Sequence, residues 1–444
     1  MIKNILFLLL IFCVNFPSFA QLDSLKTERF TIHAQTTVIT QYKPHFLAPY
    51  TGDNSLLTEE EHATSLTSTL FIGAKLWKGA SFFFNPEIAG GSGFSKTLGI
   101  AAAPNGETFR IGSPAPNIYV ARAFYRQIFG LGNDLHSSKD EFFHNHSDFN
   151  QLANFEPKRH IAITIGKVSI ADYFDDNKYS HDPRTQFMNW GLMSNGAWDY
   201  PANTRGYTPS IVLEYISPTH ELRYGFSLIP LVANGPVMNG NFSKANSNTL
   251  EYVHNHAIKN RKGAIRILGF YTMGQMGNYQ QSISQSLVNP SIESTRVYGR
   301  NKYGLGINIE QELTSNLGAF LRASWNDGKN ETWAFTEIDR SLSAGLQLNG
   351  KPWKRENDYI GAAFVLSGIS KDHRNYLAAG GKGFMLGDGK LKYANEQLVE
   401  LYYAARVRDN IFITGDYQCI INPGYNSDRK GPINIFSLKV HLRM

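Results

Sequence analysis

The sequence contains few cysteines, and their positions exclude a disulfide scaffold. Of 444 residues, two are cysteines, Cys13 and Cys419. Cys13 lies in the apolar run Ile5–Val14, which follows a basic start and precedes a small-residue pattern ending at Ala20, as signal peptidase requires. Residues 1–20 are therefore predicted to be a cleaved signal peptide. The remaining 21–444 form one domain with a single cysteine, which can make neither an internal disulfide nor a cysteine metal site.

Long apolar runs are also missing. After residue 20 no stretch approaches the ~18 apolar residues that a membrane-spanning helix needs. The net charge of +6 is too small to indicate nucleic acid as a partner. Aromatic residues, in contrast, make up 13% of the chain, and 39 residues are glycine. Together with a signal peptide and alternating strands, this composition is typical of an outer-membrane β-barrel.

The motifs of common enzyme classes are absent as well. The chain has no G-x-S-x-G of a serine hydrolase, and GGKGF at 380–384 lacks the pattern of a phosphate-binding loop. The acids around position 175 do not have the spacing of an EF-hand. The sequence therefore predicts no catalytic residue, no cofactor and no metal site, and a protein that is not an enzyme.

Segments of alternating apolar and polar residues recur from end to end and predict sixteen β-strands. In the first strand Phe30 and Ile32 share one face and Thr31 lies on the other, and the last strand, 433–444, sets an apolar face against a basic one. Connections after even-numbered strands are short and those after odd-numbered strands are long, except for the long stretch 131–158. An even number of strands with short turns on one side predicts an all-β, closed, transmembrane antiparallel barrel.

Two predicted strands concern the interior directly. The strand Asn117–Arg126 is expected to set Tyr119 against Arg122 and Arg126, which are four residues apart and face the same way. A later strand is expected over 335–348.

The longest irregular stretch, 169–205, follows a strand that ends at Lys167 and carries charges of both signs. A loop of this length is uncommon in a compact domain unless it has a function. Its acids could bind a hard cation, contact a solute, or pair with basic residues and hold the loop against the barrel wall. These acids are Asp172, Asp175, Asp176, Asp182 and Asp199, and the candidate basic partners are Arg122, Arg126, Arg184 and Arg205.

Three long stretches resemble the OprB-type carbohydrate-selective porins: IYVARAFYRQ (118–127), ITIGKVSIADYFDDNKYSHDPRTQFMNW (163–190) and GAWDYPANTRGY (196–207). The similarity extends over nearly the whole chain after the signal peptide. The resemblance implies a sixteen-stranded outer-membrane barrel whose third extracellular loop folds inward and narrows the channel at 169–205. It also implies passive diffusion of sugars through a partly basic channel, although some members of the broader family are linked to manganese uptake.

Sugars require planar hydrogen-bonding groups, which arginine and carboxylates supply, and flat apolar faces such as tryptophan. The two tryptophans of the loop could instead pack within it or lie at the membrane interface. The pairs His144/His146 and His254/His256 have a spacing that can hold zinc, but solvated polar residues are the commoner explanation. The residues predicted to line the channel or contact the solute are Arg122, Arg126, Lys167, Asp172, Asp175, Asp176, His181, Arg184, Trp190, Trp198, Asp199, Arg205, Glu396 and Asp416.

The sequence thus predicts a passive porin for mono- or small oligosaccharides in the outer membrane of a Gram-negative bacterium. Its expected partners are carbohydrate solutes, outer-membrane lipid and lipopolysaccharide, with no nucleic acid, and its expected oligomeric state is monomer or trimer. The alternatives are a divalent-cation (Mn²⁺) porin of the same fold, an outer-membrane barrel enzyme, and a secreted soluble β-rich glycan-binding protein.

Overall fold

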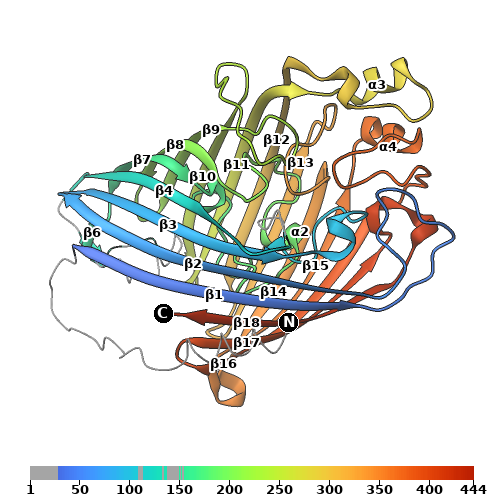
Figure 1. Ribbon diagram of the computed structural model, residues 1–444. Helices are drawn as coiled ribbons and strands as arrows, with labels where there is room; N and C mark the ends of the chain where they lie inside the picture. The colour runs from blue at the N-terminus through green and yellow to red at the C-terminus, as the bar shows by residue number, and fades with distance from the viewer. Residues whose placement is uncertain (1–28, 109–113, 133–134, 138–149, 151, 153–154) are drawn as a thin grey trace.

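The computed structural model describes residues 29–108, 114–132, 135–137, 150, 152 and 155–444, so the predicted signal peptide and the pair His144/His146 lie outside the described residues. Sixteen antiparallel strands form one closed sheet (Figure 1). The sheet closes where β1 (Phe30–Lys43) pairs with β18 (Ile433–Arg443). The predicted sixteen-stranded closed barrel is confirmed.

The other strands follow in chain order around the barrel, and short helical segments occupy the connections. The strands between the two ends are β2 (Glu61–Trp77), β3 (Ala80–Gly91), β4 (Asn117–Gly130), β7 (His160–Val168), β8 (Thr208–Ile216), β9 (His220–Leu228), β10 (Asn246–Ile258), β11 (Arg261–Met276), β12 (Val297–Glu312), β13 (Leu317–Asn326), β14 (Arg340–Gly350), β15 (Arg355–Gly368), β16 (Glu396–Arg408) and β17 (Ile411–Ile421). The short helices are η1 (Phe94–Thr97), η3 (Ile170–Asp172), α2 (Trp190–Met193), α3 (Tyr279–Gln285), η4 (Glu293–Thr295), η5 (Lys351–Trp353), α4 (Lys371–Ala378), η6 (Pro423–Tyr425) and η7 (Ser427–Arg429). None of the helices in the described part of the chain is long and apolar enough to cross a membrane.

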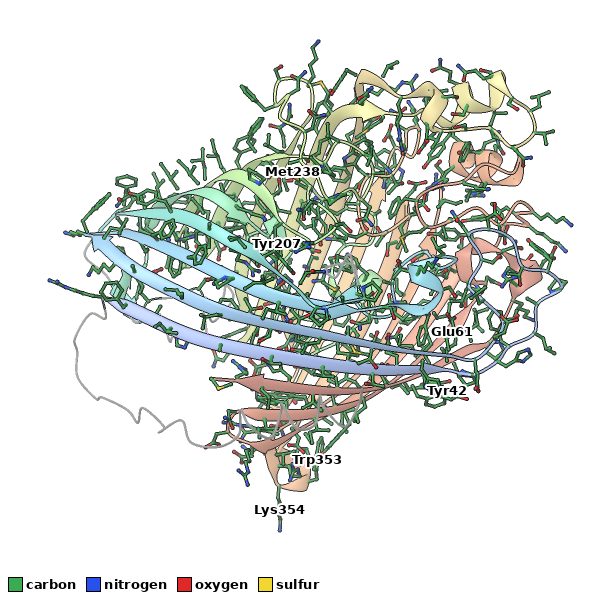
Figure 2. The ribbon with its side chains drawn as sticks, viewed as in Figure 1. Tyr42, Glu61, Tyr207, Met238, Trp353 and Lys354 are labelled. Carbon is green, nitrogen blue, oxygen red and sulfur yellow. The ribbon has the colours of Figure 1, made fainter. Side chains whose placement is uncertain are left out.

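Alternation along each strand separates an apolar outward face from a polar inward face. On β18, Phe436 and Leu438 are exposed to the outside, whereas Ser437, Lys439 and His441 are buried. Every strand of the barrel exposes at least one large apolar side chain on its outer face, and Figure 2 shows these side chains projecting from the ribbon. A continuous apolar surface of this kind belongs against lipid, because in water it would drive aggregation.

The connections are short at one end of the barrel and long at the other. Figure 2 places Trp353 and Lys354, in the short β14–β15 connection, at one end, and Tyr42, Glu61 and Met238 near the long connections. Helices α3 and α4 lie together at the long-loop end (Figure 1).

The exception at 131–158 is an excursion on the short-turn side, and the strand count holds, because β4 and β7 pair directly. The excursion contains a small two-stranded sheet, β5 (Leu135–Ser137) with β6 (Phe155–Pro157). Two of its residues reach the inward face of the barrel. Asn150 accepts a hydrogen bond from Asn85 at 3.0 Å, and Leu152 belongs to the apolar cluster that includes Phe83 and Phe124.

The structure corrects two details of the predicted strands. In β4 the register shifts, so that Arg122 faces Asn85 while Val120 faces Pro86. This β-bulge turns Tyr119 to the inward side, where its hydroxyl donates to Glu87, and not to the opposite face from Arg122 as predicted. Residues 335–339 belong to the loop before β14, and Phe335 has a φ of 59°, a value that a regular strand does not allow.

Two loop segments pack against the inward side chains of the strands. The first is the connection between β3 and β4, in which Pro104 accepts a hydrogen bond from Gln418 of β17 at 2.7 Å. The second is 169–205, and the two segments contact each other where Trp190 N donates to Ala103 O at 3.0 Å. Residues 169–205 therefore contact both the wall and a second loop.

Candidate functional site

A cavity of about 780 Å³ opens inside the barrel at the short-turn end. Residues beside the short connections, such as Asn357, Asp409 and Arg443, line its outer part, and residues between 169 and 186 line its inner end. Charged side chains of both signs and amide side chains surround it, and Phe71 and Tyr359 supply aromatic surfaces. Of the predicted site residues, those that line the cavity are Arg122, Asp172, Asp176, His181 and Arg184.

Arg122 and Asp172 form a bidentate ion pair at the cavity wall. Nε and Nη2 of the guanidinium each lie 2.6 Å from a carboxylate oxygen. Arg122 projects inward from β4, and Asp172 ends η3 at the start of the long loop. The planar fork of arginine matches a carboxylate in this geometry, so the pair fixes the beginning of the loop to the wall.

Asp175 is the most enclosed anchor of the loop. Its carboxylate lies 3.1 Å from Nε of Arg322 on β13 and accepts a hydrogen bond from the Asn308 amide at 2.7 Å. It also accepts a hydrogen bond from the backbone N–H of Asn195, twenty positions further along the loop. Both Asp175 and Arg322 are 1% exposed. A buried pair supported by this many hydrogen bonds is costly to break, so it holds two parts of the loop on one point of the wall.

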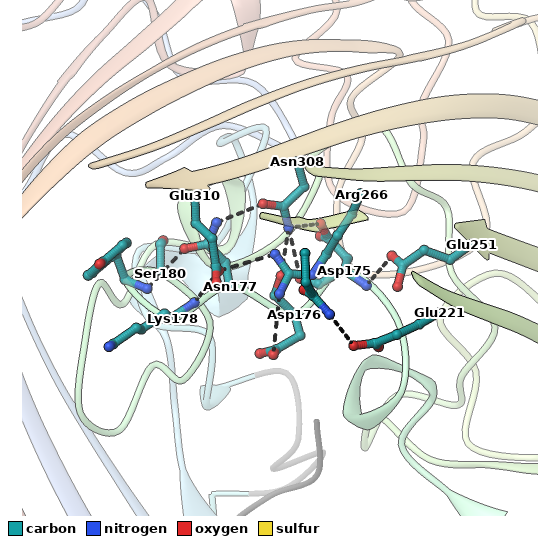
Figure 3. Close-up of polar contacts among 12 residues, drawn as sticks. Asp175, Asp176, Asn177, Lys178, Ser180, Glu221, Glu251, Arg266, Asn308 and Glu310 are labelled. Atoms are coloured by element: carbon teal, nitrogen blue, oxygen red, sulfur yellow. Dashed lines mark hydrogen bonds and ion pairs between the residues drawn. The ribbon is translucent and has the colours of Figure 1, made fainter. Parts of the chain in front are cut away.

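The next residues continue this network across the wall (Figure 3). Arg266 of β11 donates to Glu310 of β12 at 3.1 Å, and its guanidinium lies 3.8 Å from Asp176. Glu310 accepts a hydrogen bond from the backbone N–H of Lys178, and Glu251 of β10 accepts one from Asp175 N–H. Asp176 remains partly exposed at 25% and faces the cavity, so it combines an ion pair with access to solute.

Asp199 joins the far end of the loop to the long-loop side of the barrel. Its carboxylate lies 3.5 Å from the ammonium of Lys302 on β12 and accepts hydrogen bonds from the backbone N–H groups of Trp333 and Ala334. Burial raises the pKa of Asp199, an effect that Lys302 and the two N–H groups oppose. Lys302 is also 3.7 Å from Asp339, which in turn lies 3.1 Å from Nδ1 of His373.

The two tryptophans of the loop are packed among other rings. Trp190 stacks on Phe335 at a centroid distance of 4.6 Å, and Trp198 lies 5.1 Å from Tyr200. They are 1% and 2% exposed, so neither offers a free ring face to a solute. Of the interpretations left open by the sequence, packing within the loop is the one that the structure favours.

Glu396 and Asp416 are buried on the inward face of the strands, away from the cavity. Glu396 accepts hydrogen bonds from the backbone N–H of Ala101 and Gly424 and so fastens two loops. Asp416 lies on β17 near Glu400, whose carboxylate accepts hydrogen bonds from backbone N–H groups of the long loop at Met188 and Asn189. We therefore place Glu396 among the groups that support the loops, whereas Asp416 is buried beside Glu400, which does so.

The remaining predicted basic residues have other partners. Arg126 pairs with Glu214 of β8 at 2.7 Å, and the guanidinium of Arg205 lies 3.9 Å from the ring centroid of Tyr119. Lys167 follows the outward row of β7, and its ammonium donates to Val120 O at 2.7 Å. Lys167 is not among the residues that line the cavity, and its ammonium lies 6.0 Å from the ring centroid of the buried Tyr207.

Arg184 lies in the cavity wall and pairs with a residue of the other inward segment. Its guanidinium is 3.2 Å from Glu107 and 3.8 Å from Glu87 on β3. This contact between residues 169–205 and the β3–β4 connection was not predicted. The β3–β4 connection is rich in Gly, Pro and Ala, and nothing in its sequence indicates that it folds into the barrel.

Sequence reasoning also missed the wall bases Arg266, Lys302 and Arg322. Each lies on the inward face of a predicted strand, and this position could have been used to identify it from the sequence. A buried base on a barrel wall requires an acid within reach, and the nearest long acidic segment in the sequence is 169–205.

The pair His254/His256 lies on the outer face of β10 and has no part in the cavity. Among the residues that the structure describes, no group of three or more His, Cys, Asp and Glu side chains is arranged to hold a metal ion.

Comparison with known proteins agrees with this architecture. The model of the OprB family, described as carbohydrate-selective porin, matches residues 53–444. The chain belongs to the OprB family. A solved structure of OprB from Pseudomonas putida at high pH is 14% identical, covers 94% of each chain and gives a TM-score of 0.69. The low-pH structure of P. putida OprB is 11% identical with a TM-score of 0.49, covering 94% of this chain and 92% of that one.

A search of curated proteins finds no match. Membership of the OprB family and the closed barrel identify a channel and not an enzyme, and place the protein in the outer membrane.

Proposed function

We propose that this OprB-family porin lets mono- and small oligosaccharides diffuse passively across the outer membrane. In this proposal residues 169–205 narrow the channel, and residues 1–20 are the export signal. The solute passes the cavity at the short-turn end, where Arg122, Asp176 and Arg184 present donors and acceptors to its hydroxyl groups.

The observation that carries the proposal is the composition of the cavity wall. Guanidinium, carboxylate and amide groups line it together with apolar and aromatic side chains, and most of the charges are already paired. Paired charges offer directional hydrogen bonds without a strong net field. Such a wall suits neutral, hydroxyl-rich solutes, which must bind weakly enough to leave.

A divalent-cation porin would require carboxylates that face the cavity without a basic partner. Asp172 is paired with Arg122, Asp175 with Arg322 and Asp199 with Lys302. These ion pairs make these three loop acids poor ligands for a hard cation, and they favour the sugar hypothesis.

Reconstitution into liposomes tests the proposal. We expect osmotic swelling in glucose and in a disaccharide at rates well above those of protein-free liposomes, with slower entry of larger oligosaccharides. A parallel assay with an encapsulated metal-sensitive dye follows Mn²⁺. Selective entry of Mn²⁺ without entry of any sugar would overturn the proposal.

A further inference from the structure

A row of histidines interrupts the apolar outer surface of the barrel near the short turns. His220 shares the outward face of β9 with the exposed Leu222, and His254 and His256 share that of β10 with the exposed Leu250. Most outward positions at other strands are apolar or aromatic. Polar side chains that face lipid are uncommon, so the row calls for an explanation.

The three imidazoles form one stack across two strands. His220 and His254 are direct cross-strand partners with ring centroids 5.2 Å apart, and His254 lies 5.8 Å from His256. The ends of the stack are fixed: Nδ1 of His220 is 2.7 Å from the Tyr252 hydroxyl, and Nε2 of His256 is 3.0 Å from the Gln311 carbonyl oxygen. The stack is therefore held in place by its neighbours.

A glycine makes room for one of these contacts. A Cβ at Gly263 would lie 2.7 Å from Nε2 of His256 and 2.5 Å from the Gln311 oxygen. Any side chain at this position of β11 would separate the two groups, so the contact depends on the glycine.

The geometry does not suit a metal ion. The rings are inclined by 30° and 20° to each other, so they are close to parallel. Ring nitrogens bind metal in the plane of the ring, and nearly parallel planes do not converge on one ion. The described residues include no cluster that could hold one.

The stack instead presents an N–H donor of His254 beside positive charge. Nδ1 of His254 is buried without a hydrogen-bond partner, which favours the tautomer with its proton on Nε2, the other ring nitrogen. The adjoining β10–β11 turn adds the exposed Lys259, and β11 begins with Arg261, which is 40% exposed and paired with Glu312. Donors next to cations are the groups that recognise phosphate.

The position of the stack identifies the source of that phosphate. The stack lies between the apolar surface and the short turns, at the level where the aromatic Tyr252 faces outward. Short turns of outer-membrane barrels face the periplasm, and interfacial aromatic residues mark the headgroup level.

We propose that the histidine stack of β9 and β10, with the basic β10–β11 turn, binds the phosphate of an anionic phospholipid in the periplasmic leaflet. The acyl chains then lie along Leu222 and Leu250 on the adjoining apolar surface. The site is separate from the channel and independent of the solute that the channel carries.

Native mass spectrometry of the full chain in detergent tests this site with dioleoyl phosphatidylglycerol as the probe. We expect one lipid retained by the wild type and about tenfold weaker retention by the double variant His220→Ala/His254→Ala. The matched control is Gln127→Ala, an outward polar residue that hydrogen-bonds Trp77 at the same end of the barrel. It should retain the lipid as the wild type does.

A second variant guards against a folding defect. Lys259→Asn changes one exposed turn residue whose φ is 51°, a conformation that asparagine tolerates, and should weaken retention about threefold with an intact barrel. Equal retention by the wild type and both variants would overturn the proposal, as would equal binding of dioleoylglycerol, which has no phosphate. Displacement of the lipid by millimolar inorganic phosphate alone would reassign the site to free phosphate. A change of oligomeric state in the double variant, with lipid retention unchanged, would make the row a contact between copies and also overturn the proposal.

Discussion

Single residues inside the barrel act mainly as members of charge pairs that join the wall to the loops. Arg122–Asp172 and Arg322–Asp175 differ in one respect that matters for function. The first pair lines the cavity, whereas the second is 1% exposed on both sides. The first should influence what passes, and the second should influence whether the loop stays in place.

Removing the arginine and removing the aspartate of the cavity pair should shift ion selectivity in opposite directions. Arg122→Ala removes the positive member of the pair from the wall and should favour cations, while Asp172→Asn removes the negative member and should favour anions. The measurement is the reversal potential across a planar bilayer under a KCl gradient. Unchanged reversal potentials in both variants would place the pair outside the ion path.

The buried Asp339 predicts a pH dependence of the long-loop end. Burial tends to raise the pKa of Asp339, but His373, Lys302 and hydrogen bonds outweigh it, so the pKa lies well below its ordinary value of 3.8. A carboxyl group whose pKa is lower in the folded than in the unfolded state stabilises the folded state at pH values above its unfolded pKa. This contribution is lost as the pH falls from the unfolded pKa through the lower folded pKa. Glu337 faces the same site, and burial raises its pKa, which gives a slope of opposite sign.

The variant Asp339→Asn separates the two contributions. At pH 7 it should lose about 3–5 kcal/mol of stability, because Lys302 and His373 lose a buried partner. Below pH about 4 the difference from the wild type should begin to shrink, and it should disappear only below the depressed pKa of Asp339. Urea unfolding in lipid vesicles, followed by tryptophan fluorescence between pH 3 and 7, measures the difference. A constant difference over this range would contradict the assignment.

At the scale of elements, the β-bulge in β4 and the loop 169–205 determine the interior. The bulge brings Tyr119 to the inward side, where Arg205 of the loop lies over its ring. The loop is fixed to β4, β11, β12 and β13 by side chains of the wall. An element held at several separate points should behave as a rigid part of the barrel.

A designed disulfide tests that rigidity. A Cβ built at Gly196 lies 3.0 Å from Cβ of Ser341 on β14, so a disulfide, which requires about 3.5–4.5 Å, needs the loop and the strand to separate by roughly 0.5 Å. In a Cys419→Ala background, Gly196→Cys/Ser341→Cys should form the bond under oxidising conditions and leave the conductance unchanged. The single variant Gly196→Cys is the matched control. If the bond fails to form, or if its reduction changes the conductance, the loop is not fixed at this point.

For the whole molecule, the sequence predicts the barrel much better than it predicts the site. Strand periodicity repeats along the chain and is independent of partners, so the strand number and the two faces of β18 followed directly from it. Partners within the lumen depend on which strands meet across it. Asp175 and Arg322 lie 147 positions apart, and no local pattern relates them. The β-bulge in β4 could not be predicted from the sequence either. One unpaired residue moves the Tyr119 side chain to the other face of the strand, while the alternation of residues around it stays unchanged.

The central claim concerns the whole molecule: neutral sugars pass through the cavity bounded by residues 169–186. Single-channel current in a planar bilayer, recorded while glucose or a disaccharide is added, tests it most directly. We predict brief, concentration-dependent interruptions of the ion current, and a changed half-blocking concentration in Arg122→Ala. An ion current that no sugar interrupts, combined with no sugar entry into liposomes, would contradict it.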